Sequence, residues 1–396
     1  MATTALSKLL KTFNTPQHDY KISTELFGQF DANKVAKELD LEKKGAAKGA
    51  ENKPAASSQI PDDVESQITA VTEKGLDPRG FILCTDDSHS GTIVNEGHMN
   101  RVVRHAIECG CDPLIALQMA TINTATHFGL ERELGSIAPG RRADVILTSD
   151  LKTLPIEHVI ARGQTVARMG ICEVECPHLD WPRHARSTVH MGPAKSADAF
   201  KISAPDGANS VRANVIGVVE NQAPTKALKA DLPVTNGLVE TTGDICQIAL
   251  VERHCATGGV VNGFVSGFGY SGKMAIASTV AHDSHHMIVV GTDREMMAAA
   301  ANRLSNVGGG ISVWKDGAEL ALVELPIAGL MSDEPAKDVA RKADQMVRAM
   351  QDCGCTLNNA YMQHSLLALV VIPEIRISDL GLVDVTKFQL TPLFES

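Results

Sequence analysis

The chain has 396 residues, enough for two or three domains with a sizeable core. Its formal net charge of −10 disfavours a general nucleic-acid or anionic-membrane surface but suits a small neutral substrate. The longest apolar stretch, residues 366–373, is too short to span a bilayer and is predicted to be a buried strand. Nine scattered cysteines, with no signal sequence at Met1–Lys11, predict reduced thiols and a cytoplasmic protein.

The first sixty residues differ in composition from the rest. Residues 31–59 are rich in Lys, Glu, Ala, Asn and Ser, which predicts a poorly ordered tail or linker over residues 1–60, and we assign it no function. Asp112 is expected to cap a helix whose first residue is Pro113. The elements predicted up to the turn at Gly163 are helices over 62–73, 95–109 and 112–128, a short strand over 81–84, two strands around Pro139-Gly140 and a strand pair over 159–169.

The second half of the chain follows an irregular junction over residues 171–209. Strands and helices alternate there, and this alternation favours an α/β layered domain. A hairpin is expected to turn at Asp316-Gly317. The predicted strands cover 211–219, 247–252, 260–267 and 286–291, and the predicted helices cover 293–306 and 332–352.

Two adjacent acids, Asp86 and Asp87, directly follow the predicted strand over 81–84. In barrels of alternating strands and helices, catalytic groups stand at the C-terminal ends of strands. A carboxylate there can bind a divalent metal and accept a proton from metal-bound water, while its neighbour bonds a substrate nitrogen. From spacing alone, an acidic turn or an Asx cap accounts for the pair somewhat better than a catalytic role does.

Longer motifs carry a family resemblance. Phe81-Ile-Leu-Cys-Thr-Asp-Asp-Ser-His, Gly135-Ser-Ile-Ala-Pro-Gly-Arg-Arg-Ala-Asp-Val and Ser278-Thr-Val-Ala-His-Asp-Ser-His-His resemble the adenine deaminases of the amidohydrolase superfamily. The resemblance runs with gaps from about residue 62 to the end. It implies an α/β fold in which residues 61–134 hold the last strand and closing helices of a (β/α) barrel. Residues 135–170 would form a β-sandwich segment, and residues 171–396 an adenine-deaminase-type C-terminal α/β layered domain.

The resemblance also implies a reaction, the hydrolysis of adenine to hypoxanthine and ammonia. A metal-bound hydroxide would attack the purine carbon that carries the amino group. Asp86 would be both the metal ligand and the catalytic proton acceptor. Manganese is the metal that the family suggests, with iron or zinc also compatible. The implied substrate-binding residues are Asp87, His89, His282, Asp283 and His285.

A complete metal site of this superfamily also needs a His-x-His pair, and the fourteen histidines include none. We therefore expect either a complementing N-terminal chain or a homo-oligomer, and no nucleic-acid or membrane partner. Two alternatives stay open. One is a non-catalytic truncated remnant or subunit that binds a purine or a partner chain. The other is a different amidohydrolase that acts on a cyclic amide.

Overall fold

The computed structural model describes residues 61–85, 88–175, 179–220, 222–358 and 360–395. All of these residues fall within one unit that spans residues 55–396. The predicted tail over residues 1–60 lies outside the described residues, as do Asp86 and Asp87.

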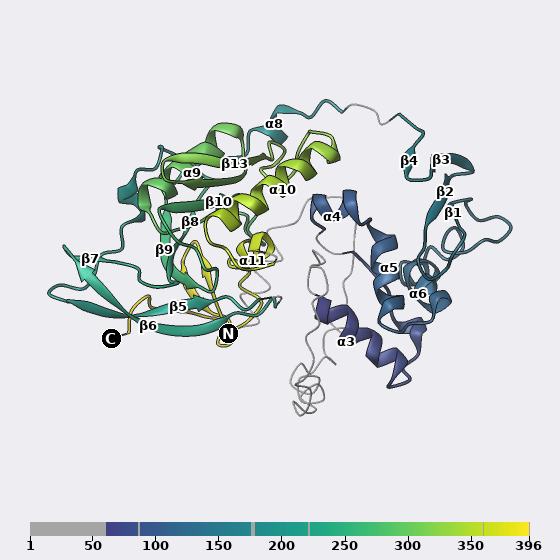
Figure 1. The fold of residues 1–396 in the computed structure, drawn as a ribbon, viewed down its shortest axis with the longest axis horizontal. Coiled ribbons are helices and arrows are strands. Elements are labelled where there is room, and N and C mark those ends of the chain that lie inside the picture. The colour runs from purple at the N-terminus through teal and green to yellow at the C-terminus, as the bar shows by residue number, and fades with distance from the viewer. Residues whose placement is uncertain (1–60, 86–87, 176–178, 221, 359, 396) are drawn as a thin grey trace, which may run out of the picture. The chain divides into compact units, whose positions relative to one another are not determined.

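Residues 61–128, here called the helical segment, form short helices around a small core (Figure 1). The helix predicted over 95–109 begins only at Met99, because Gly97 adopts a φ of +108° that helices exclude, and Asn95 instead ends the preceding short helix. The Asp112 cap is confirmed, since its Oδ1 accepts the amides of Leu114 and Ile115 at 2.9 and 3.2 Å. The elements are α3 (Pro61–Thr72), η2 (Pro78–Gly80), α4 (Ser90–Asn95), α5 (Met99–Glu108), α6 (Pro113–Ala120) and α7 (Ile122–His127).

The strand predicted over residues 81–84 is absent from the described structure. Phe81 has extended backbone, but the neighbour of this stretch is a helix, and the Leu83 amide donates to the Met119 carbonyl at 3.2 Å. A strand requires a ladder of partners on another strand. The two acids therefore follow an extended stretch that no described strand pairs.

A small antiparallel sheet follows, with strand order β1-β2-β3-β4. Its strands are β1 (Val145–Thr148), β2 (Ile156–Ala161), β3 (Gln164–Arg168) and β4 (Ile171–Cys172). The predicted turn at Gly163 is confirmed. No described strand precedes Pro139, so the strand pair expected around Pro139-Gly140 is wrong in its first member.

Residues 197–395, here called the sheet domain, contain a nine-stranded sheet of order β13-β12-β10-β11-β8-β9-β5-β6-β7 (Figure 1). The turn at Asp316-Gly317 between β12 and β13 is confirmed. The strands are β5 (Ser210–Gly217), β6 (Lys226–Thr235), β7 (Leu238–Val239), β8 (Cys246–Val251), β9 (Val260–Ser266), β10 (Met274–Ser278), β11 (Met287–Gly291), β12 (Gly310–Lys315) and β13 (Ala318–Glu324). The remaining elements are α8 (Arg183–Arg186), η3 (Ala197–Phe200), α9 (Arg294–Val307), α10 (Ala336–Asp352), α11 (Ala360–Leu366) and the three-stranded sheet β14 (Ile375–Ser378), β15 (Gly381–Asp384) and β16 (Gln389–Thr391).

Helices cover both faces of this large sheet. Successive side chains of a strand point to opposite faces, so Ile248 and Leu250 of β8 pack with Met346 of α10, whereas Ala249 and Val251 share a core with α9. Strands buried on both faces read as continuous apolar runs, which is why the sequence indicates them. The layered arrangement confirms the mixed α/β class.

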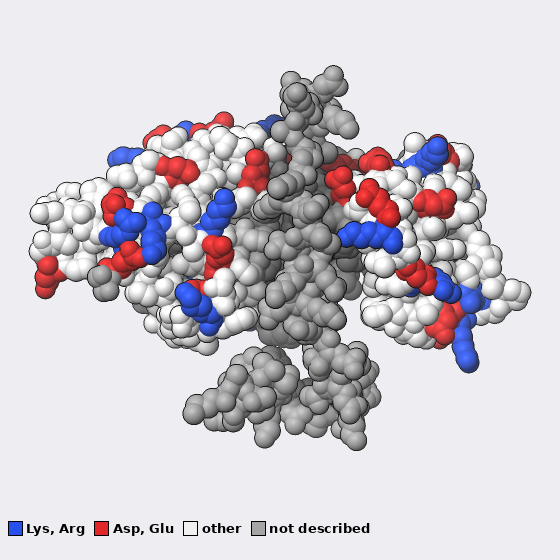
Figure 2. Space-filling model, turned by 90° about the horizontal axis from the view of Figure 1, so that it is seen from below, with Lys and Arg blue, Asp and Glu red and all other residues white. Residues whose placement is uncertain are grey.

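One strand prediction in this domain is wrong. Residues 366–373 begin at the last residue of α11 and continue as turns and bends, not as a strand. No helix among the described residues is long and apolar enough to cross a membrane. Acidic and basic side chains are interspersed on the face shown in Figure 2.

Candidate functional site

His89 occupies the N-cap position of α4. Its backbone is extended, with φ −64° and ψ 140°, and its Nδ1 accepts the amide of Gly91 at 3.2 Å. The imidazole is partly buried, with the Tyr361 ring edge-on at a centroid distance of 5.9 Å. Burial lowers the pKa of His89, and the nearby Asp344 carboxylate opposes that shift. The residue is therefore held as a neutral imidazole at the start of the helix.

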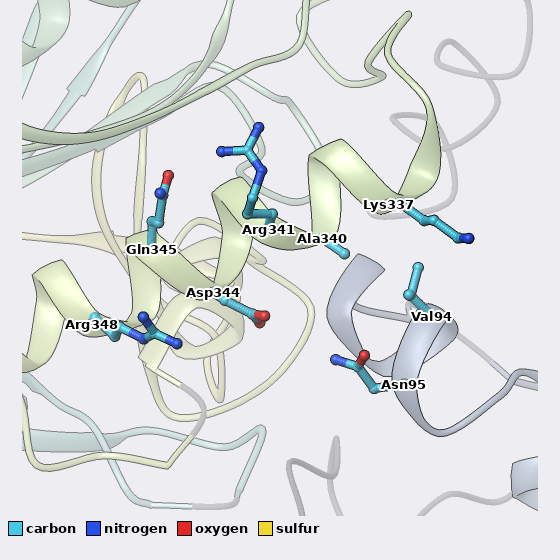
Figure 3. Close-up of a pocket in the computed structure, with 8 residues that line it drawn as sticks. All are labelled: Val94, Asn95, Lys337, Ala340, Arg341, Asp344, Gln345 and Arg348. Carbon is cyan, nitrogen blue, oxygen red and sulfur yellow. The ribbon is translucent and has the colours of Figure 1, made fainter.

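A polar pocket of about 450 Å³ lies between α4 and α10. Asp344 and Asn95 point toward one another across it, whereas Arg341 points away (Figure 3). Arg341 instead pairs with Asp338 on its own helix, with 3.6 Å between Arg341 Nη2 and Asp338 Oδ1. The pocket is lined by Val94, Asn95, Lys337, Ala340, Arg341, Asp344, Gln345 and Arg348.

The loop between β10 and β11, residues 279–286 and here called the histidine loop, carries three further candidate residues. The rings of His282 and His285 are 5.3 Å apart, and His282 Nδ1 lies 3.9 Å from the Asp283 carboxylate. His285 Nδ1 accepts the amide of Ala281 at 3.2 Å. Burial lowers the pKa of His285, and His282 and Arg253 lower it further. The structure thus brings His282, Asp283 and His285 together on one loop.

Helix α11 touches both candidate groups. Tyr361 contacts His89, and the Ser365 carbonyl accepts the amide of His282 at 2.9 Å. One turn of helix therefore links the loop that follows the acid pair with the histidine loop of the sheet domain. Sequence reasoning missed Tyr361 and Asp344, because a lone tyrosine or an aspartate on an amphipathic helix gives no signal of a tertiary contact.

Arg253 lies two residues beyond the end of β8 and bonds to the backbone of the histidine loop. Arg253 is 2% exposed, and its guanidinium donates to the carbonyl oxygens of His285, Thr188 and Ala328. Next to it, His254 donates from Nε2 to the Ser284 carbonyl at 2.8 Å, and its ring lies 4.8 Å from that of His286. These bonds fix the loop backbone.

Comparison with known proteins shows what two parts of the chain are similar to. Residues 222–389 match the model of the adenine deaminase C-terminal domain, and residues 16–166 match that of the amidohydrolase family. Residues 222–389 are therefore similar to the C-terminal domain of adenine deaminases. This confirms the resemblance expected from the sequence motifs. The amidohydrolase match begins within residues 1–60, to which the sequence analysis assigns no function.

Individual adenine deaminases are very similar to the chain. Those of Ruegeria sp. and Roseobacter denitrificans are each 78% identical over 84% of it, and that of Moorella thermoacetica is 42% identical over 84%. The matched parts make up 55–56% of those proteins. The chain thus spans about half the length of the curated relatives it matches.

Amidohydrolases generally use a divalent metal, but the described residues do not fit one. They contain no group of three or more His, Cys, Asp or Glu side chains that could hold an ion. The histidine loop does not meet this requirement, although it gathers His282, Asp283 and His285. Within the described part of the chain, the residues do not form a metal centre.

Proposed function

We propose that this chain acts in the hydrolytic deamination of adenine. Water adds to the purine carbon that bears the amino group, the C–N bond breaks, and hypoxanthine and ammonia leave. The observation that carries the proposal is the match of residues 222–389 to the adenine deaminase C-terminal domain. The high identity to proteins named adenine deaminase supports the same substrate.

We propose the following roles for individual residues. Asp86 is the proton acceptor and one ligand of a divalent ion, which we take to be manganese, and the other ligands come from outside the described residues. Asp87 and His89 contact the base. The contact of His89 with α11, and the bond from α11 to the histidine loop, support a shared role for that loop. Its contributing residues are His282, Asp283 and His285.

We further propose that residues 61–134 are the closing part of an amidohydrolase barrel, that residues 135–170 belong to its β-sandwich, and that residues 171–396 are the C-terminal domain. Apolar side chains without cover among the described residues support this assignment: Leu114 is 59% exposed, Phe128 65% and Ile137 86%. Phe128 and Ile137 line the same pocket, and contiguous exposed apolar patches mark surfaces that contact other structure. The active unit then includes an upstream barrel portion, in the same polypeptide or a separate chain.

The test uses a completed protein. The part of the Ruegeria sp. relative that this chain does not match is joined to the chain and loaded with Mn²⁺. We expect ammonia and hypoxanthine from adenine, and no turnover of guanine, cytosine or a cyclic amide. Turnover of the cyclic amide in place of adenine would overturn the assigned substrate. A folded, metal-loaded fusion that turns over none of them would favour a non-catalytic subunit.

A further inference from the structure

Two elements of the sheet domain reach the N-terminus of α4. From α11, Tyr361 presents its ring to the His89 imidazole at 5.9 Å, with the two ring planes inclined by 65°. From α10, Asp344 approaches so closely that a Cβ on Gly91 would lie 3.1 Å from its Oδ1 and 3.2 Å from His89 Nδ1. Gly91 is buried at this junction. The first turn of α4 therefore lies between its N-cap residue, His89, and the side chains of Tyr361 and Asp344 from the sheet domain.

The hydrogen bond at Nδ1 determines where the imidazole carries its proton. Nδ1 accepts the Gly91 amide, so a neutral ring must bear its hydrogen on Nε2. Protonation of both nitrogens would remove this acceptor and place a charge in a partly buried position. The ring edge of Tyr361 restricts rotation of the imidazole, and Asp344 stands beside the same turn. His89 is thus prepared as an Nε2–H donor, which suits the acceptor nitrogens of a purine ring.

We propose that Tyr361 and Asp344 are positioning residues that fix the orientation and tautomer of His89 from the sheet domain. The significance of this for catalysis rests on the proposed adenine deamination, but the positioning itself does not. It gives the C-terminal domain a role at the site, because α11 also anchors His282 through the Ser365 carbonyl. Among the described residues, the charged group from the packed elements that acts on this turn is Asp344, while Lys337, Arg341 and Arg348 line the neighbouring pocket and Arg341 points away from it.

The test follows the His89 ring by NMR in the full chain with ¹⁵N-labelled histidine. We expect the parent protein to show the Nε2–H tautomer. In Tyr361→Ala, loss of the covering ring should expose the imidazole of His89. We expect the population of the Nδ1–H tautomer to increase and the pKa of His89 to rise by at least about half a unit. Tyr361→Phe keeps the ring and should behave as the parent. Asp344→Asn removes the stabilising anion and should lower the pKa of His89.

Asp338→Asn, on the same helix but paired with Arg341, is the matched control and should leave His89 unchanged. If Tyr361→Ala does not fold, Tyr361→Leu replaces it with the same expectation. The proposal is overturned if the folded Tyr361 variant keeps the parent tautomer and titration of His89, or if Asp344→Asn and Asp338→Asn give the same shift.

The outcome is separable from that of the proposed function. Should His89 respond as expected while the completed protein fails to release ammonia from adenine, the positioning stands and the function falls. If the completed protein deaminates adenine but the tautomer and the pKa of His89 are unchanged in both variants, the positioning proposal alone is rejected. In an active protein, Tyr361→Ala should also move the acidic limb of the kcat/KM–pH profile upward with the pKa of His89, and Tyr361→Phe should restore it.

Discussion

The sheet domain and the helical segment differ in the size of the apolar core that each contains. Every residue of β8, β10 and β11 is buried, with helices on both faces of the sheet. In the helical segment, α5 buries Val102, Val103 and Ala106, whereas Leu114 and Phe128 remain largely exposed. The comparison teaches that the sheet domain is built on strands buried on both faces, while the helical segment has a smaller core, and that each region also exposes single large side chains such as Phe388 and Phe128.

A matched pair of phenylalanines gives the largest expected difference. Phe264, in β9, is fully buried, and Phe264→Ala should lower the free energy of unfolding of the sheet domain by about 3–5 kcal/mol. Phe128 is 65% exposed, and Phe128→Ala should change the free energy of unfolding of the chain by less than about 0.5 kcal/mol. Urea denaturation of the whole chain followed by circular dichroism measures both. Equal effects of the two substitutions would contradict the contrast between the regions.

The buried guanidinium of Arg253 sets the next effect. Arg253→Met leaves the carbonyl oxygens of His285, Thr188 and Ala328 without that donor, so we expect a loss of about 3 kcal/mol. Arg303→Met is the control, because Arg303 forms a partly exposed pair with Glu319 at 2.7 Å, a pair worth less than about 1 kcal/mol. A loss at Arg253 no larger than at Arg303 would show that the histidine loop does not depend on this residue.

Acid sensitivity of the sheet domain gives a smaller effect. His364 is buried beside Phe268 and Tyr270, and neither ring nitrogen has a hydrogen-bond partner among the described residues. Burial lowers its pKa to about 3 from the ordinary 6.5. Between about pH 6.5 and pH 3, His364 is protonated in the unfolded chain but neutral in the folded chain. The free energy of unfolding therefore falls as the pH decreases toward 3. At about pH 5 the loss is about 2 kcal/mol.

His364→Leu should remove this part of the pH dependence, and His127→Leu, at an exposed helix end, is the matched control. The measurement is the free energy of unfolding between about pH 7 and pH 5. An unchanged slope in His364→Leu would mean that His364 is protonated in the folded protein, contrary to its burial.

The sequence indicates the sheet domain more accurately than the helical segment, for physical reasons. Apolar runs buried on two faces and a turn at Asp316-Gly317 are local signals that survive folding. The strand β6 was missed, because Leu232 is its sole buried residue and Pro233 follows it. The strand expected over 81–84 fails because no described strand lies beside it to form a ladder.

Much less of the candidate site is readable from sequence. The histidine loop was predicted as a group, and the structure places its members together. The contact of Tyr361 with His89 joins residues more than 250 positions apart and depends on the packing of α11, which no local pattern encodes. The roles of Asp86 and Asp87 stay predictions, since both residues lie outside the described part of the chain.

The most direct test of the account is the rate of ammonia release from adenine by the completed, Mn²⁺-loaded protein, with Asp86 intact or replaced in Asp86→Asn. The account predicts that the substitution lowers kcat by at least about 100-fold while the protein stays folded, because the proton acceptor is lost. Undiminished turnover by a folded Asp86→Asn protein would contradict it.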